Sequence, residues 1–214
     1  MIVKFFVKPL NQLIVLEKAY TAIKFLDVKK YREFIFNFDD EIIFSINDVT
    51  ANYLNKTIQI IHPLDIELND KKSLQLLYKK LSTHLSEELR NKISTLEKDI
   101  LDIIEIMSLE AQCTIEYNEN IDLTKLLALY QVEVKNIKKE NYLEFLLTYI
   151  KYNCELNNCS IVISFGLTNI LTNDELMVLQ NELSIHQISI VDFYLNNFST
   201  SVSYLTVDSD WNKL

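Results

Sequence analysis

The segment from Asp70 to Glu110 contains neither proline nor glycine, and it constrains the fold of this 214-residue chain more than any other feature. Its apolar residues recur every three or four positions, which predicts a single amphipathic helix. Such a helix would be roughly 60 Å long, longer than a compact core of this size can cover. The segment is therefore expected to form a helical arm whose apolar stripe needs another helix. The stripe consists of Leu74, Leu77, Leu81, Leu85, Leu89, Ile93, Leu96, Ile100, Ile103 and Met107.

The sequences on both sides of this segment predict an α/β body. Before it, a helix over 28–38 is expected, with Asp27 as its cap, together with strands over 2–7, 13–16, 21–26, 41–46 and 57–61. The first three of these strands are expected to form a meander. After it, the chain predicts strands over 160–165, 188–194 and 202–207, and a helix that begins with a capping box at Thr172. The strand–helix–strand spacing predicts a right-handed crossover between two parallel strands.

The division of the chain into domains follows from these patterns. A second amphipathic helix over 140–156 is the expected partner of the arm, with an acidic loop and a short helix over 112–130 between the two. The predicted fold class is thus α/β, with a βαβ core and an extended helical leg. The head comprises residues 1–69 and 158–214, and the leg comprises residues 70–157, inserted in the head.

Composition excludes several classes of function. Gly166 is the one glycine, whereas a Walker-type phosphate loop and a dinucleotide fingerprint each need at least two. The three histidines are far apart, and a hydrolase built on paired carboxylates would lack a convergent histidine or nucleophile, so we expect no enzyme and no catalytic residues. The cysteines, Cys113, Cys154 and Cys159, lack CxxC spacing and are expected to be reduced core residues. No secretory signal or spanning segment is evident, which predicts a cytoplasmic protein with no membrane partner.

Four segments, in this order and spacing, resemble the ring-forming adaptation proteins of type II-A CRISPR loci, the Csn-two family. The first is Leu-Asn-Asp-Lys-Lys-Ser-Leu-Gln-Leu-Leu-Tyr over 68–78, and the second is Ile-Val-Ile-Ser-Phe, ending at Phe165. The others are Leu-Thr-Asn-Asp-Glu-Leu over 171–176 and Ile-Ser-Ile-Val-Asp-Phe from Ile188. The resemblance covers about residues 10–207, and its segments are signatures of a fold more than of a chemistry.

This resemblance implies a head distantly similar to nucleotide-binding ATPases but without their phosphate loop. It implies a homotetrameric ring whose lysine-lined hole encircles double-stranded DNA ends without sequence preference. It also implies calcium binding near the junction of head and leg. The implied role is spacer acquisition in antiviral defence, alongside the CRISPR integrase and effector proteins and without catalysis.

The distribution of charge bears on whether a chain of net charge −9 can hold DNA. From Lys71 to Lys98 there are seven basic and three acidic residues, and from Thr124 to Lys139 there are four basic residues and one acidic residue. From Glu140 onward there are two basic and nine acidic residues. Charges more than about 8–10 Å away are screened at physiological salt, so DNA in the hole of a ring would respond mainly to the charges on the protein surface nearest to it. The expected DNA-binding residues are Lys125, Lys135, Lys138, Lys139, Lys71, Lys72 and Lys56. A solvated helix face is the alternative for these lysines.

An acidic loop lies at the position where the resemblance implies calcium. Glu116, Glu119 and Asp122 are the expected ligands, because calcium prefers oxygens from carboxylates, amides and main chain. Asn118, Asn120 and Lys125 depart from an all-acidic pattern. The alternative is that Asp122 caps the following helix while the glutamates are solvated.

A second function of another class stays open from the sequence. The arm could pair protomers into a protein-only scaffold that binds no DNA. Both functions predict oligomers, because the apolar stripe of the arm exceeds what one partner helix covers. They differ in whether linear duplex binds with an affinity that depends on salt.

Overall fold

The computed structural model describes residues 3–16, 19–47, 49–50, 56–111, 116–118, 120–135, 137, 140–195, 204–208 and 210. The chain divides into two compact units. The first unit comprises Met1–Leu68 and Asn136–Leu214, and the second comprises Asn69–Lys135. Nothing in the part of the chain that the structure describes forms a helix long and apolar enough to cross a membrane.

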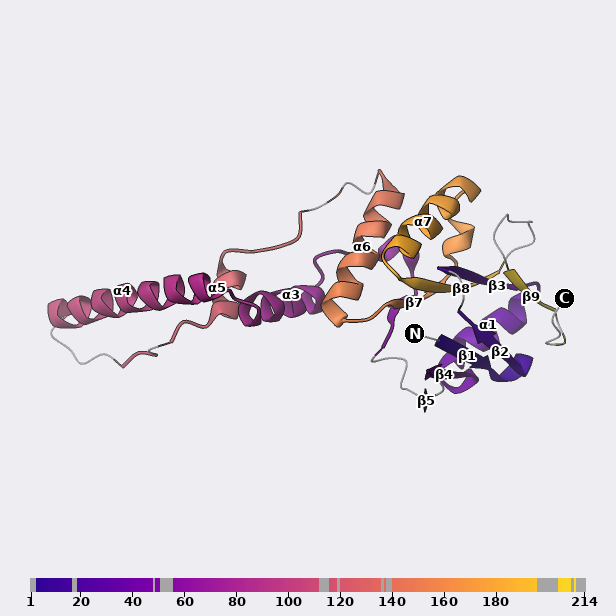
Figure 1. The fold of residues 1–214 in the computed structure, drawn as a ribbon, viewed down its shortest axis with the longest axis horizontal. Helices are drawn as coiled ribbons and strands as arrows, with labels where there is room; N and C mark the ends of the chain where they lie inside the picture. Colours follow the sequence, from indigo (N-terminus) through magenta and orange to yellow (C-terminus); the bar gives the residue numbers. More distant parts are fainter. Residues whose placement is uncertain are drawn as a thin grey trace. The chain divides into compact units, whose positions relative to one another are not determined.

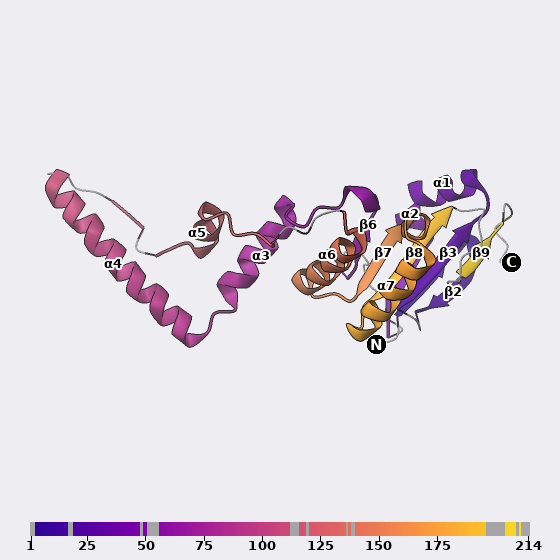
Figure 2. The ribbon, with the colours of Figure 1, turned by 90° about the horizontal axis from the view of Figure 1, so that it is seen from above.

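The first unit is built on a five-stranded parallel sheet, which confirms the predicted α/β class. The strand order is β6–β7–β8–β3–β9, and every neighbouring pair is parallel. The predicted crossover is present as β7, helix α7 and β8, seen side by side in Figure 2. The bounds are β3 Tyr20–Phe25, β6 Ile58–Ile60, β7 Ile161–Phe165, β8 Ser189–Leu195 and β9 Tyr204–Val207, with α7 over Asn173–Ile185.

Alternate residues of the parallel strands serve two separate cores. Ile190 of β8 lies in a core formed with α6 (Tyr142–Asn157) and α7, while its neighbour Val191 lies in the other core, with α1 (Val28–Phe36). This arrangement follows from the two-residue period of a strand, and it explains the continuous apolar runs of strands covered on both faces. The second core is rich in rings, including Phe25, Phe34, Phe38, Phe165 and Phe193.

A smaller antiparallel sheet covers that second core. Its order is β2–β1–β4–β5, with bounds Val3–Val7 for β1, Gln12–Val15 for β2, Ile42–Ile46 for β4 and Val49–Thr50 for β5. The predicted meander is wrong in its third strand, because β3 joins the parallel sheet between β8 and β9. The reason is burial: five of the six residues of β3 are buried, as in a strand covered on both faces.

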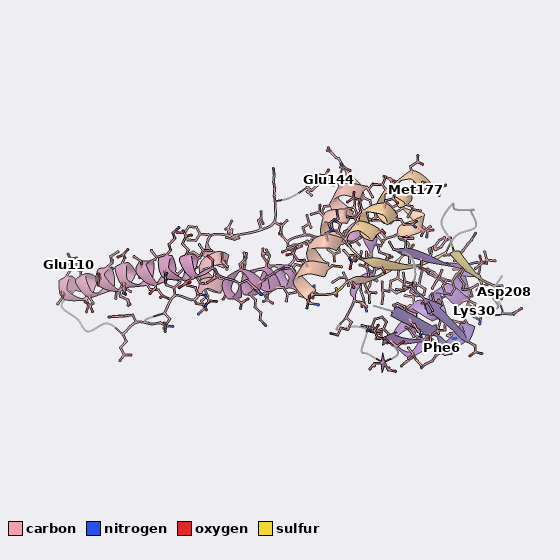
Figure 3. The ribbon with its side chains drawn as sticks, in the orientation of Figure 1. Phe6, Lys30, Glu110, Glu144, Met177 and Asp208 are labelled. Atoms are coloured by element: carbon pink, nitrogen blue, oxygen red, sulfur yellow. The ribbon has the colours of Figure 1, made fainter. Side chains whose placement is uncertain are left out.

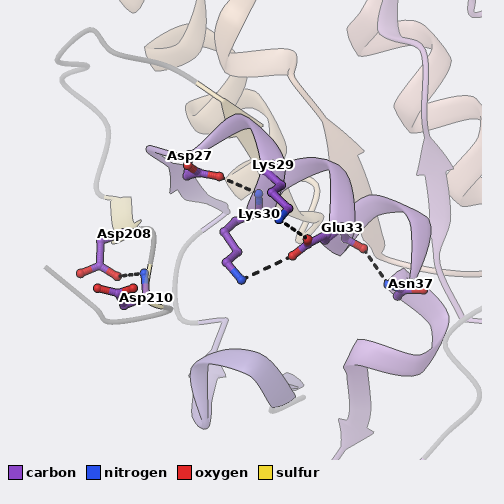
Figure 4. Close-up of polar contacts among 7 residues, drawn as sticks. All are labelled: Asp27, Lys29, Lys30, Glu33, Asn37, Asp208 and Asp210. Carbon is purple, nitrogen blue, oxygen red and sulfur yellow. Dashed lines mark hydrogen bonds and ion pairs between the residues drawn. The ribbon is translucent and has the colours of Figure 1, made fainter.

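Helix α1 begins where the sequence predicted. The side chain of Asp27 accepts a hydrogen bond from the Lys30 main-chain N–H at 2.9 Å (Figure 4). Lys29 and Lys30 both lie within ion-pair distance of Glu33. Helix α1 ends at Phe36, and the side-chain amide of the next residue, Asn37, donates to the Glu33 carbonyl. The short helix α2 (Phe38–Glu41) follows directly and leads into β4.

Helix α6 belongs to the first unit, although the sequence analysis placed residues 140–156 in the arm. Phe145, Leu146 and Ile150 of α6 are buried in the first core, and Lys151 bonds Glu182 of α7 at 2.8 Å. The boundary of the second unit therefore falls at Lys135, whereas the leg was predicted to extend to residue 157. Spacing alone identified the apolar face of α6 but not the surface that covers it.

The second unit is helical. Its helices are α3 (Lys71–Thr83), α4 (Glu87–Ala111) and α5 (Leu123–Leu129). The prediction of one uninterrupted helix over 70–110 is corrected, because α3 ends at Thr83. The hydroxyls of Ser82 and Thr83 bond the Lys79 carbonyl, and the Ser86 hydroxyl accepts from the Leu89 N–H at the start of α4. Side chains of this kind compete with the helical ladder and favour a helix boundary.

Candidate nucleic-acid interface

The N-terminus of α3 presents two of the predicted DNA-binding lysines. Asp70 caps this helix by accepting from the main-chain N–H groups of Lys72 at 2.9 Å and Ser73 at 3.1 Å, and also from the Ser73 hydroxyl. This cap fixes the first turn, and the side chains of Lys71 and Lys72 are exposed on it. Both lysines thus start from a rigid main chain, which limits the conformational freedom lost on binding a polyanion.

Lys135 lies next to this turn in space, although the two are far apart in sequence. The Asn69 side chain forms two hydrogen bonds with the main chain of Val134, accepting from its N–H at 3.0 Å and donating to its carbonyl at 2.9 Å. This pairing imitates a strand ladder and holds residues 132–135 against the segment that leads into α3. The exposed Lys135 therefore follows directly on a residue anchored beside Lys71.

Helix α5 brings Lys125 to the same region, because α5 packs against α3 (Figure 1). Asp122 caps α5: its carboxylate accepts from the Thr124 hydroxyl at 2.6 Å and from the main-chain N–H groups of Thr124 and Lys125. The Lys125 ammonium lies 3.5 Å from the same carboxylate. The hydrogen bond from the Thr124 side chain, followed by the one from the Lys125 main chain, lowers the pKa of Asp122.

These elements form what we call the α3–α5 module, residues 69–83 and 122–135. Helix α3 carries four lysines and no carboxylate. Two of the module's three carboxylates, those of Asp70 and Asp122, serve as helix caps. By contrast, residues 99–110 of α4 carry four acidic residues and no basic one. The module therefore concentrates positive charge in a protein that is anionic as a whole. Its lysines are Lys71, Lys72, Lys79, Lys80, Lys125 and Lys135.

The remaining predicted lysines are not brought into this module. Lys56 is exposed in the first unit, two residues before β6. Lys138 and Lys139 lie outside the described residues. The module also adds Lys79 and Lys80, which the sequence analysis counted in the basic segment but did not select.

The loop predicted to bind calcium is held to α4 by a residue that the sequence analysis did not select. The Glu97 carboxylate accepts from the Ile121 N–H at 3.0 Å, so the loop passes beside the middle of α4. Glu116 and Asp122 are exposed, and Glu119 lies outside the described residues.

The described part of this loop shows no cluster of metal ligands. Asp122 is committed to the cap of α5, as the alternative interpretation expected, and no three His, Cys, Asp or Glu side chains among the described residues are grouped as metal ligands. Calcium binding by Glu116, Glu119 and Asp122 therefore stays a prediction. A calcium titration followed by calorimetry on the wild type and on Glu116→Gln checks it, since unchanged binding would remove Glu116 from the site.

A buried carboxylate in the first unit is a further polar feature that the sequence analysis missed. Asp192 of β8 is fully buried and accepts from the hydroxyls of Tyr20, Ser164 and Thr168 and from the N–H groups of Leu167 and Thr168. Gly166, at φ +87°, lets the chain turn after β7 so that these two N–H groups reach the carboxylate. The main-chain N–H groups of the turn after β7 thus donate to a carboxylate of the same chain.

The long helix α4 has an exposed apolar face. Along the whole of α4, all of which the structure describes, no residue is buried within the single chain. Its side chains project from the helix along its length up to Glu110, near its end (Figure 3). Ile103 is 55% exposed and Leu109 is 79% exposed. The other large apolar residues exposed on this helix are Leu89, Leu96, Ile100, Ile106 and Met107.

One known protein family matches most of this chain. The family described as CRISPR-associated protein (Cas_Csn2) matches residues 36–211, which include the second unit and most of the first. The chain belongs to the Csn2 family. This confirms the family inferred from the four sequence segments.

Other comparisons add little to the Csn2 assignment. Two structures of MJ1267, an ATP-binding cassette of an ABC transporter, align with 100% of this chain and 89% of theirs at 8% identity and a TM-score of 0.46. A TM-score below 0.5 carries no argument about fold or function. A comparison with curated proteins finds no match.

Membership of the Csn2 family establishes a CRISPR-associated role in adaptation. The family is not known as a family of enzymes, and it links the chain to the CRISPR machinery. Within this Csn2 chain, the α3–α5 module was visible in the sequence only as local charge. The contacts that assemble it, Asn69 with Val134 and α5 with α3, join residues too far apart in sequence for spacing to reveal.

Proposed function

We propose that this Csn2-family protein binds double-stranded DNA ends without sequence preference, in the lysine-lined hole of a ring of four copies, and thereby assists spacer acquisition. The observation that carries the proposal is the α3–α5 module. It gathers six lysines on one packed group of segments, whereas residues 99–110 of α4 carry four acidic residues and no basic one.

The chemistry of these side chains suits binding without base readout. Each lysine that neutralises a phosphate releases a counterion, which gives binding that depends on salt and not on sequence. Reading guanine in the major groove most often uses arginine in a bidentate contact. The chain has two arginines, Arg32 and Arg90, and neither lies in the α3–α5 module.

Assembly is supported by the exposed face of α4. An amphipathic helix of 25 residues with no buried side chain leaves a large apolar surface in water. Burial of that surface between copies of the chain would stabilise an oligomer, and an oligomer can turn its lysines inward. Other proteins of the CRISPR system, the integrase and the effector, are the proposed partners of the DNA-bound ring.

The test is binding of a linear duplex across a range of salt concentrations. We expect log Kd to rise linearly with log salt, and we expect the double variant Lys71→Glu/Lys72→Glu to bind about tenfold more weakly with a shallower slope. Acidic side chains in the first turn of a helix interact favourably with the helix dipole, so α3 should stay folded in this variant. A slope that is flat in the wild type would defeat the proposal.

A matched pair of single variants separates local from global charge. Lys135→Glu and Lys29→Glu change the net charge equally, and both replace exposed lysines, one in the α3–α5 module and one on α1. We expect the first to weaken duplex binding and the second to leave it unchanged. Light scattering on each variant shows whether the assembly is intact. Equal effects of the two variants would attribute binding to net charge alone.

A second candidate function is a protein-only scaffold. The exposed apolar face of α4 favours it, because that face calls for a protein partner and not for DNA. This function predicts oligomers whose size does not respond to duplex, and wild-type protein that binds duplex no better than Lys71→Glu/Lys72→Glu does.

A further inference from the structure

Two of the three cysteines meet at the end of α6. The helix ends with Asn158 in the left-handed conformation, at φ 49° and ψ 50°. The Cys159 N–H bonds the Cys154 carbonyl at 3.0 Å, and the Asn158 N–H bonds the Glu155 carbonyl at 3.4 Å. This pair of hydrogen bonds is the Schellman arrangement, in which the side chain just past the helix contacts the side chain one turn before its end. Those two side chains are Cys159 and Cys154.

Their environments differ in a way that suits a two-step oxidation. Cys154 is buried in the first core, whereas Cys159 is partly exposed at its edge. The contact with the Cys154 thiol lowers the pKa of Cys159, and the neighbouring Ile161 N–H acts in the same direction. The same contact, together with burial, raises the pKa of Cys154. An accessible thiol with a lowered pKa beside a protected one is the usual arrangement of a redox-sensing pair.

We propose that Cys154 and Cys159 form a reversible disulfide when the protein meets a peroxide, so that the junction of α6 and β7 is a site of redox modification. The proposal goes beyond DNA binding and does not depend on it. In a reducing compartment such a bond is transient, as regulatory disulfides are.

The steps balance with hydrogen peroxide as the oxidant. The Cys159 thiolate attacks one peroxide oxygen, the O–O bond breaks, and Cys159 becomes a sulfenic acid as the first water leaves. The Cys154 sulfur then attacks the Cys159 sulfur, the S–O bond breaks, and a second water leaves with the thiol proton. Two thiols lose two electrons, and one peroxide becomes two waters. A thiol reductant reverses the change by exchange.

The position of the bond fixes its structural effect. It would join the last turn of α6 to the residue two positions before β7, and α6 is anchored in the same core by Leu146 and Ile150. The Schellman hydrogen bonds already hold the main chains of the two residues close together in the reduced protein, so we expect formation of the bond to need little movement of the main chain. Oxidation would therefore lock the end of α6 and leave the fold of the first unit unchanged.

Peptide mapping of the wild-type protein tests the proposal. The protein is treated with hydrogen peroxide, blocked with iodoacetamide and digested with a glutamate-specific protease, which cuts after Glu155 and so separates the two cysteines. We expect the two fragments to stay linked, about 2 Da lighter than their sum, to lose alkylation at both cysteines, and to separate after dithiothreitol. The proposal is overturned if both cysteines remain alkylated, or if Cys159 reaches the sulfinic acid while Cys154 is still alkylated.

The variant Cys154→Ser is the control, because it retains a hydrogen-bond donor beside Cys159 but removes the resolving thiol. We expect Cys159 in this variant to persist as a sulfenic acid that dimedone labels, whereas wild-type Cys159 escapes the label. Equal labelling of the two proteins would mean that Cys154 does not resolve the intermediate, and it would reject the pair. If the variant fails to fold, the peptide mapping of the wild-type protein still tests the proposal by itself.

Discussion

Helices α6 and α4 are both amphipathic, yet the chain uses them in opposite ways. The 16 residues of α6 include five that are buried, among them Leu146 and Ile150, whereas none of the 25 residues of α4 is buried. The first unit therefore has its own core, and α4 has an apolar face that the single chain leaves in water. The comparison teaches that an apolar stripe shows which face of a helix seeks burial, but not whether the chain itself provides the covering surface.

The largest expected effect on the free energy of unfolding is in the core of the first unit, at Asp192. Asp192→Ala would leave five buried donors without their acceptor and should lower the free energy of unfolding by about 3–5 kcal/mol, as measured by urea denaturation. Asp192→Asn, which keeps one acceptor oxygen, should cost less. A loss below about 1 kcal/mol for the alanine variant would show that these donors find other partners.

A pair of alanine substitutions tests the comparison of α6 with α4 directly. Ile150→Ala removes a fully buried side chain and should cost about 2–5 kcal/mol. Ile103→Ala, on the exposed face of α4, should cost about 0.5 kcal/mol or less in the isolated protomer. It should instead shift the proposed oligomer to smaller species in sedimentation velocity. Equal costs for the two substitutions in dilute protein would break the comparison.

Within the second unit, the cap of α3 should have a moderate effect. Asp70→Ala removes the acceptor for the Lys72 and Ser73 N–H groups and should cost about 1 kcal/mol, measured as a loss of helical circular dichroism on heating. Asp70→Asn should recover most of it. Because Asp70→Ala also removes a negative charge beside Lys71 and Lys72, duplex binding should not weaken. Weaker binding would mean that the cap positions the lysines.

The smallest expected effect is the change in stability when the pH is lowered and Asp122 is protonated. The pKa of Asp122 is lowered in the folded chain, so its contribution to stability is complete above the ordinary value of 3.8 and is lost as the pH falls through the lowered value. Carbonyl NMR should therefore show Asp122 titrating below 3.8, and Thr124→Ala should raise its pKa, because the Thr124 hydroxyl bond is the main cause of the shift. A pKa that does not change in this variant would contradict the assignment.

Much of the fold could be predicted because it depends on local patterns. The Asp27 and Thr172 caps and the parallel pair β7 and β8 follow from short spacings, and all are present. The placement of β3 was wrong, because a strand is paired by partners distant in sequence. The break between α3 and α4 had a local signal in Ser82, Thr83 and Ser86, which a count of apolar residues does not register.

For the candidate site, the sequence supplied the lysines and the structure supplied their neighbours. The charge of residues 71–80 could be read directly, but the proximity of Lys135 and Lys125 depends on the Asn69–Val134 pairing and on the packing of α5 against α3. Of the calcium ligands expected, Asp122 caps α5, and calcium binding by these residues stays a prediction.

The amino-acid sequence by itself determined the family, the α/β class, the helix caps and the segregation of charge, because each of these can be read from short segments and from their order along the chain. Tertiary structure alone decided that α6 is a core helix and α4 is not, that Asp192 is buried among five donors, and that the lysines of three segments share one module. The physical reason is that burial and charge density are properties of neighbours in space, and a folded chain sets those neighbours through contacts between residues that are far apart in sequence.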